Sequence, residues 1–174
     1  MFKRKLGKSN IDVSAMGMGC WAIGGTNWGK VDDTESTRAI LHALDSGITL
    51  FDTADCYGVN GHSETILGKA LGKQRSSVVI ATKFGIGNDK QTGKPLGTRS
   101  ARDFITHACE ASLKRLNTDY IDLYQFHKGG YPQRSEPIQE VLESLVEAGK
   151  IRYYGWSTDL PEKAEAFVDS PHYV

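Results

Sequence analysis

Apolar residues along this chain follow two alternating spacings, and together these spacings predict a repeated order of strand and helix. Continuous apolar runs at residues 48–52, 78–83, 120–127 and 151–157 are typical of strands buried in a parallel sheet. Between these runs, apolar residues recur three and four positions apart, as they do on the buried face of a helix. The clearest helical stripe comprises Ile105, Ala108, Cys109, Ser112, Leu113 and Leu116.

Turn residues predict the elements outside this alternation. Residues 3–14 are typical of a small hairpin, and residues 15–21 form an apolar run short enough for a further buried strand. Residues 85–95 make a long polar loop, a kind of segment that is often functional in a compact domain.

Capping residues predict where two of the helices begin. Asp32 with Glu35 is a capping-box pattern, and Asp159 with Glu162 predicts a last helix that extends to Val168.

The resulting order is a hairpin followed by five strand–helix units. Corresponding points of successive strands lie about thirty residues apart, for example Phe51 and Ala81, as in parallel strands joined by right-handed helical crossovers. Two α/β architectures fit this order, an open doubly wound sheet and a (β/α)8 TIM barrel. A complete barrel has eight units in about 250 residues, so in a barrel this chain supplies about five units of an incomplete one.

Four polar residues stand at or just beyond the ends of the predicted strands. Asp52 and Lys83 each end an apolar run, His127 ends another, and Tyr57 lies in the loop that follows Asp52. Taken singly, each has an ordinary structural interpretation as a turn, packing or strand-end residue. Because the carboxyl ends of parallel strands share one edge of a sheet, we expect the four side chains to converge there.

These residue types suit proton transfer to a carbonyl group. A free tyrosine has a pKa of about 10, and a nearby ammonium group such as Lys83 favours the phenolate and lowers that pKa. Asp52 keeps the lysine charged, and His127 can orient a substrate carbonyl or help to deliver the proton. We therefore expect Tyr57 to protonate a carbonyl oxygen as a hydride arrives at the carbon.

Composition excludes several other classes of function. The chain has 21 basic and 21 acidic residues, so its formal net charge of zero predicts no nucleic-acid or membrane partner. Its three cysteines lack the spacing of a metal site, and no run approaches the roughly 20 apolar residues of a membrane span. The basic first residues lack the apolar core of a signal peptide, so we expect a cytoplasmic protein without a metal.

One motif is interpreted as a chance match. Residues 17–22 fit the dinucleotide pattern G-x-G-x-x-A, but that pattern should open a helix at once, and the helix cap comes ten residues after Ala22, at Asp32. Cys56 beside Tyr57 has no basic neighbour in the sequence, and we expect it to fill the loop.

The sequence resembles the aldo-keto reductase family over nearly the whole chain. The matching segments are residues 47–58, 61–64, 67–71, 79–84, 111–116, 119–127 and 149–157. The resemblance implies a TIM barrel whose hairpin closes the bottom, in a single domain at residues 1–174 that is incomplete at its C-terminal side. It also implies NADPH-dependent reduction of an aldehyde or ketone. The catalytic residues that it implies are Asp52, Tyr57, Lys83 and His127, the residues binding NADP(H) are Trp21, Asp52, Ser157 and Thr158, and the residues binding the carbonyl substrate are Trp21, Tyr57 and His127.

The sequence departs from the family pattern in three places. Thr158 replaces a frequent asparagine, residues 128–130 replace a frequent Pro-Asp pair, and the last three units of the barrel are absent. We therefore expect two open strand edges and an isolated chain that is inactive and poorly stable. One alternative is a non-catalytic, cofactor-binding member of the fold, as in potassium-channel β subunits, but such a module needs none of the four catalytic residues. The other is an open Rossmann-like dehydrogenase, which the failed glycine motif disfavours. The substrate and the oligomeric state stay open.

Overall fold

The computed structural model describes the chain except for residues 26–27, 87–100 and 128–135. Most of the predicted loop at 85–95 and the departure at 128–130 therefore lie outside the described residues. Within the described residues, no helix has the length and apolar character needed to cross a membrane.

The centre of the fold is a five-stranded parallel sheet whose strands lie side by side in chain order. A doubly wound sheet would reverse its strand order at a switch point, so this order is that of a barrel segment. The strands are β3 (Gly17–Gly19), β4 (Leu50–Asp52), β5 (Val79–Phe84), β6 (Ile121–Phe126) and β7 (Ile151–Trp156). The helices between them are α1 (Asp33–Asp45), α2 (His62–Leu71), α3 (Ala101–Leu116) and α4 (Glu136–Glu147).

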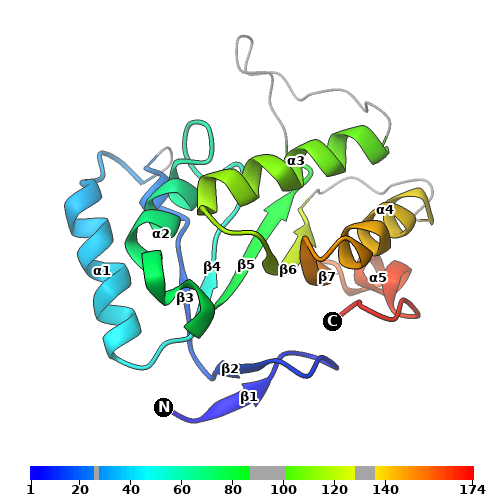
Figure 1. Cartoon of the computed structure of the whole chain (residues 1–174), viewed down its shortest axis with the longest axis horizontal. Helices are drawn as coiled ribbons and strands as arrows, with labels where there is room; N and C mark the ends of the chain where they lie inside the picture. The colour runs from blue at the N-terminus through cyan, green and yellow to red at the C-terminus, as the bar shows by residue number, and fades with distance from the viewer. Residues whose placement is uncertain (26–27, 87–100, 128–135) are drawn as a thin grey trace.

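The helices follow one another around the sheet, each packed on the next (Figure 1). The main hydrophobic core lies between them and one face of the sheet, because alternate strand residues such as Phe51, Ile80 and Tyr124 point that way and are fully buried. The predicted stripe of α3 also lies in this core, with Ile105, Cys109, Ser112, Leu113 and Leu116 all buried.

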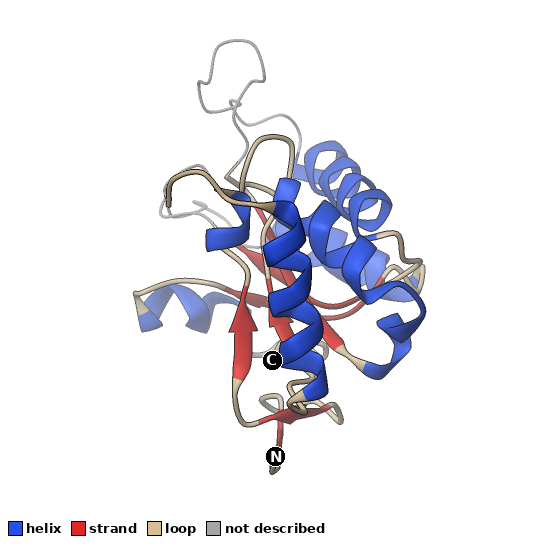
Figure 2. Cartoon of the chain, turned by 90° about the vertical axis from the view of Figure 1, so that its left-hand side faces the viewer, coloured by secondary structure: helices blue, strands red, loops and turns tan. Residues whose placement is uncertain are grey.

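The predicted hairpin lies beneath the amino ends of the strands, as Figures 1 and 2 both show. It consists of β1 (Lys3–Lys5) and β2 (Asp12–Ser14), which pair antiparallel. Ile11 and Val13 of the hairpin pack on Val79 in a second, smaller core. The hairpin therefore closes the amino end and leaves the carboxyl end of the strands for other residues.

The start of α1 agrees with its predicted cap. The side chain of Asp32 accepts hydrogen bonds from the backbone N–H groups of Thr34 and Glu35, at 2.8 and 3.0 Å. In a complete capping box the Glu35 side chain would accept from the backbone N–H of Asp32. Here the Glu35 carboxylate pairs with Arg38 at 2.7 Å instead.

The prediction of a buried strand at residues 15–21 is wrong in its burial. The strand exists as β3, but Met16 is 64% exposed and Trp21 is 47% exposed. Among the described strands β3 pairs with β4 alone, so one side of it has no neighbour to cover these side chains.

The predicted last helix is much shorter than expected. Only α5 (Pro161–Ala164) and a 3-10 turn, Glu165–Phe167, form, and Val168 is 52% exposed. The chain then turns back so that Tyr154 in β7 donates its N–H to His172 and accepts one from Val174, each at 3.0 Å. Because the chain returns to β7 at this point, the last helix has to end early. The return also covers part of the β7 edge that was expected to be open.

Candidate active site

Lys83 is the centre of the polar cluster at the carboxyl edge of the sheet. Its side chain projects from β5 toward the face opposite the helices and is 4% exposed. The ammonium group donates to Asp52 Oδ1 at 2.6 Å, to the Thr53 carbonyl at 2.7 Å and to the Tyr57 hydroxyl at 3.3 Å. All three N–H groups of a charged lysine are thereby used, so this side chain is held in place and does not extend to solvent.

Tyr57 reaches the lysine because the loop after β4 packs closely on another turn. A Cβ atom added at Gly24 would lie 2.6 Å from the carbonyl carbon of Tyr57, and one at Gly58, where φ is +83°, would lie 2.6 Å from the Gly24 carbonyl oxygen. Only glycine fits such an approach. The ring of Trp21 stacks on the ring of Tyr57 with centroids 5.8 Å apart.

His127 completes the group of four from the end of β6. Its backbone N–H donates to the Phe84 carbonyl at 2.7 Å, which continues the pairing with β5. Its ring lies edge-on to that of Tyr57, with centroids 6.1 Å apart, and Nδ1 is 3.8 Å from the thiol sulfur of Cys56. Cys56, expected to fill the loop, thus also contacts the histidine.

Burial sets the proton affinity of Tyr57 and His127. The pKa of His127 is lowered by burial first and by the charge of Lys83 second, so the ring is neutral at pH 7. The predicted effect of Lys83 on the pKa of Tyr57 is present, but it does not decide the direction of the shift. Lys83 does lower the pKa, but burial is the larger effect and the pKa is raised. The phenol therefore keeps its proton at neutral pH. Lys83 reduces the increase in pKa that burial causes.

Gln125 belongs to the site and was missed in the sequence. It pairs in register with Lys83 across β5 and β6, and its amide nitrogen lies 3.5 Å from Asp52 Oδ2. Its position in the strand could have identified it. Gln125 lies two residues after Leu123, so the two side chains point to the same face of the sheet.

Asp55 is a second carboxyl group near the cluster, and it has a different environment. Its Oδ1 atom is buried and, among the described residues, has no hydrogen-bond partner. Burial, followed by the charge of Glu64, raises the pKa of Asp55 to about 7, although Arg115 and Lys83 act in the opposite direction.

The residues expected to bind a cofactor lie along the same rim. Trp21 follows β3, and Ser157 and Thr158 follow β7, with the Ser157 N–H donating to the Phe126 carbonyl at 2.9 Å. The rim combines an exposed indole and hydroxyl groups with an aspartate, Asp52, that Lys83 neutralises. This set suits the uncharged ring and amide of a nicotinamide. Among the described residues no group of three or more histidine, cysteine or acidic residues could hold a metal ion.

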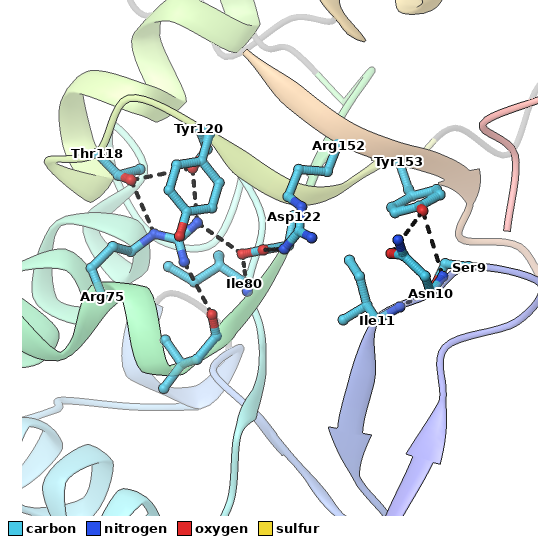
Figure 3. A network of polar contacts seen from close by, with 11 residues as sticks. Ser9, Asn10, Ile11, Arg75, Ile80, Thr118, Tyr120, Asp122, Arg152 and Tyr153 are labelled. Carbon is cyan, nitrogen blue, oxygen red and sulfur yellow. Dashed lines mark hydrogen bonds and ion pairs between the residues drawn. The ribbon is translucent and has the colours of Figure 1, made fainter. Parts of the chain in front are cut away.

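A second polar cluster lies at the amino end of the sheet, beside a cavity of about 270 Å³ under the hairpin. Figure 3 shows its centre, Asp122, between two arginines. The carboxylate accepts from Arg75 at 2.8 Å, from Arg152 at 3.0 Å and from the Ile80 N–H at 3.0 Å. Both of its oxygens are engaged within the protein, so we place the chemistry at the other end.

Several known proteins are similar to this chain. The model of the Aldo/keto reductase family matches residues 15–171. The aldo-keto reductase YhdN of Bacillus subtilis is 44% identical over 164 residues, which cover 91% of this chain and 47% of that protein. The holo form of an aldo-keto reductase from Bacillus halodurans has a TM-score of 0.87 and 36% identity, covering 100% of this chain and 56% of its own.

A third relative was solved with a bound cofactor. The aldo/keto reductase of Klebsiella pneumoniae, in complex with NADP and acetate, has a TM-score of 0.73 and 32% identity, over 91% of this chain and 50% of that one. The chain spans about half the length of the curated relatives that it matches.

Proposed function

Because this chain belongs to the aldo/keto reductase family, we propose that the complete protein is an oxidoreductase that reduces an aldehyde or ketone to an alcohol with NADPH. The observation that carries the proposal is the contact between a buried, ion-paired Lys83 and the hydroxyl of Tyr57, at 3.3 Å. A buried ammonium beside a phenol has a clear use in proton transfer and little use in a binding module.

The cofactor, when bound, supplies a hydride to the carbonyl carbon. In this proposal Trp21, Asp52, Ser157 and Thr158 hold it along the rim. The bound NADP of the Klebsiella pneumoniae relative supports this choice of cofactor.

Tyr57 acts as the general acid in the proposed reaction. Its hydroxyl proton moves to the carbonyl oxygen, so that an alcohol and a phenolate form. The Lys83 ammonium stabilises that phenolate, and Asp52, at 2.6 Å from the ammonium, is its counter-ion and holds it in place. Neutral His127 donates a hydrogen bond to the carbonyl oxygen and, with Trp21, orients the substrate.

Replacing Tyr57 by phenylalanine in the complete protein tests this role. Tyr57→Phe should lower kcat/KM for carbonyl reduction by roughly 10²–10⁴-fold, since it removes the proton donor. The affinity for NADPH, measured by fluorescence titration, should stay within about twofold, because the phenol acts on the substrate.

Tyr153→Phe is the matched control. Its hydroxyl bonds to Asn10 at 3.0 Å at the opposite end of the sheet, so its loss should leave reduction unchanged. A Tyr57→Phe enzyme that keeps its turnover but loses NADPH affinity would reject the general-acid role. A wild-type protein that binds NADPH and reduces no aldehyde or ketone would favour the non-catalytic alternative.

A further inference from the structure

The first turn of α2 lies directly behind the residues of the candidate active site. Ser63 and Glu64 in this turn are both fully buried, although both are polar. Buried polar side chains are retained where their hydrogen bonds are made, so the bonds of these two residues show what the turn holds together.

Ser63 connects three separate segments. Its hydroxyl donates to the Cys20 carbonyl at 2.7 Å and accepts from the Thr53 hydroxyl at 3.0 Å. Its backbone N–H donates to the carbonyl of Tyr57 at 3.1 Å. One residue therefore joins the end of β3, the end of β4 and the loop that carries the proposed acid.

Thr53 extends this connection to the proposed catalytic lysine. Its hydroxyl bonds to Ser63, and its carbonyl oxygen accepts from the Lys83 ammonium at 2.7 Å. A shift of Thr53 would move one of the three acceptors that hold this ammonium. The chain of contacts from Ser63 to Lys83 thus contains a single intervening residue.

Glu64 anchors the same turn to the neighbouring elements. One carboxylate oxygen accepts from Thr82, the residue before Lys83, and the other from Arg115 in α3, each at 2.6 Å. The turn cannot slide relative to β5 without breaking these bonds. Ser63 is therefore a fixed point from which the Tyr57 loop is held.

We propose that Ser63 is a positioning residue that fixes the distance between Tyr57 and Lys83 through Thr53 and the Tyr57 carbonyl. The expected loss of turnover rests on the proposed function. The expected change in the position of Lys83 relative to Tyr57 rests on the contacts alone. Alanine at position 63 would leave a carbonyl and a hydroxyl without their bonds in a buried site. The backbone N–H at position 63 would still bond to the Tyr57 carbonyl. Thr53, however, would lose its bond and shift, so that the lysine would stabilise the phenolate less well.

The test uses the complete protein with Ser63→Ala and, as matched control, Thr65→Ala. Thr65 lies in the same helix, is exposed, and bonds only locally to the Gly61 carbonyl at 3.4 Å. Ser63→Ala should lower kcat by roughly tenfold or more, since small displacements of reacting groups slow catalysis strongly. The Kd for NADPH should stay within about twofold in both variants, and Thr65→Ala should keep its kcat.

A second measurement is independent of turnover. The absorbance of tyrosinate, taken as the difference from the corresponding Tyr57→Phe protein, follows the ionisation of Tyr57 alone. Ser63→Ala should raise the pKa of Tyr57 further, because less of the Lys83 charge then reaches the phenolate. Thr53→Val should raise it as well and should add little in the Ser63→Ala background, since both act on the same contact.

The two proposals fail in different ways. A wild-type protein without carbonyl reductase activity would refute the proposed function, while the tyrosinate titration would still decide the role of Ser63. An unchanged pKa of Tyr57 in folded Ser63→Ala and Thr53→Val proteins would overturn the positioning role. So would fully additive effects of the two substitutions on that pKa.

Discussion

The two ends of the sheet each carry a carboxylate paired with basic groups, and the two pairs differ in how completely they are enclosed. At the amino end the Asp122 side chain is 1% exposed and is bound by Arg75, Arg152 and a backbone N–H (Figure 3). At the carboxyl end the Asp52 side chain is 41% exposed while its partner Lys83 is buried. One cluster is enclosed by the protein, and the other has a side open to a ligand.

The bonding of the basic groups shows the same difference. Arg75 makes four hydrogen bonds, to Thr118, Val78, Tyr120 and Asp122, and its guanidinium lies over the Tyr120 ring at 4.2 Å. Every bond of this group stabilises the scaffold. Lys83 directs one of its bonds to the hydroxyl of Tyr57, in a loop that is only half-buried. A buried charge therefore indicates chemistry when one of its partners is a titratable group that solvent or substrate can reach.

Exchanging aspartate for asparagine at each end should give opposite results. Asp122→Asn should lower the free energy of unfolding by about 3–5 kcal/mol, because Arg75 would be left buried without its counter-ion. Asp52→Asn should cost less stability, because water can reach the open side of Asp52 and the Lys83 ammonium keeps its bonds to Thr53 and Tyr57, but it should abolish most carbonyl reduction. Urea unfolding and kcat/KM of the complete protein measure both effects. Equal losses of stability at the two positions would contradict the distinction.

Asp55 makes the comparison sensitive to pH, because its Oδ1 atom is buried and has no hydrogen-bond partner among the described residues. Its pKa is raised from 3.8 to about 7 in the folded protein, so the unfolded chain loses this proton first as the pH rises. The contribution of Asp55 to stability is therefore complete below pH 4 and is lost between about pH 4 and pH 7. By linkage the loss is at most roughly 4 kcal/mol.

Asp55→Asn removes this titration and should flatten the dependence of stability on pH over that window. The measurement is urea unfolding of wild type and variant in buffers from pH 4 to pH 8. If both proteins lose stability in parallel, Asp55 is not the group responsible.

Arg152→Met should give the smallest effect and sharpens the comparison within the amino-end cluster. Its side chain is 47% exposed, whereas that of Arg75 is 11% exposed, although both bind Asp122. An exposed ion pair contributes up to about 1 kcal/mol, so thermal unfolding should shift only slightly and reduction should be unchanged. Arg75→Met should cost several times more, and similar costs for the two would show that enclosure is not the deciding factor.

The order of elements and the group of four residues could be predicted from the sequence. Strand and helix spacings are local properties, so they identified the five units, the cap at Asp32 and the strand-end positions of Asp52, Lys83 and His127. Their convergence followed from one general rule, that parallel strands share a carboxyl edge. The distances bear this out, with Lys83 at 2.6 Å from Asp52 and 3.3 Å from Tyr57.

Only the tertiary structure decided the properties that depend on residues far apart in the chain. The pKa of Tyr57 is raised because burial, which comes from several segments, outweighs the predicted effect of Lys83. The last helix is short because the chain returns to pair with Tyr154 in β7. The hydroxyl of Ser63 bonds to Cys20, 43 positions away in the chain, and to Thr53. Periodicity reports only the local backbone, whereas burial and hydrogen-bond partners are set by which segments the fold brings together.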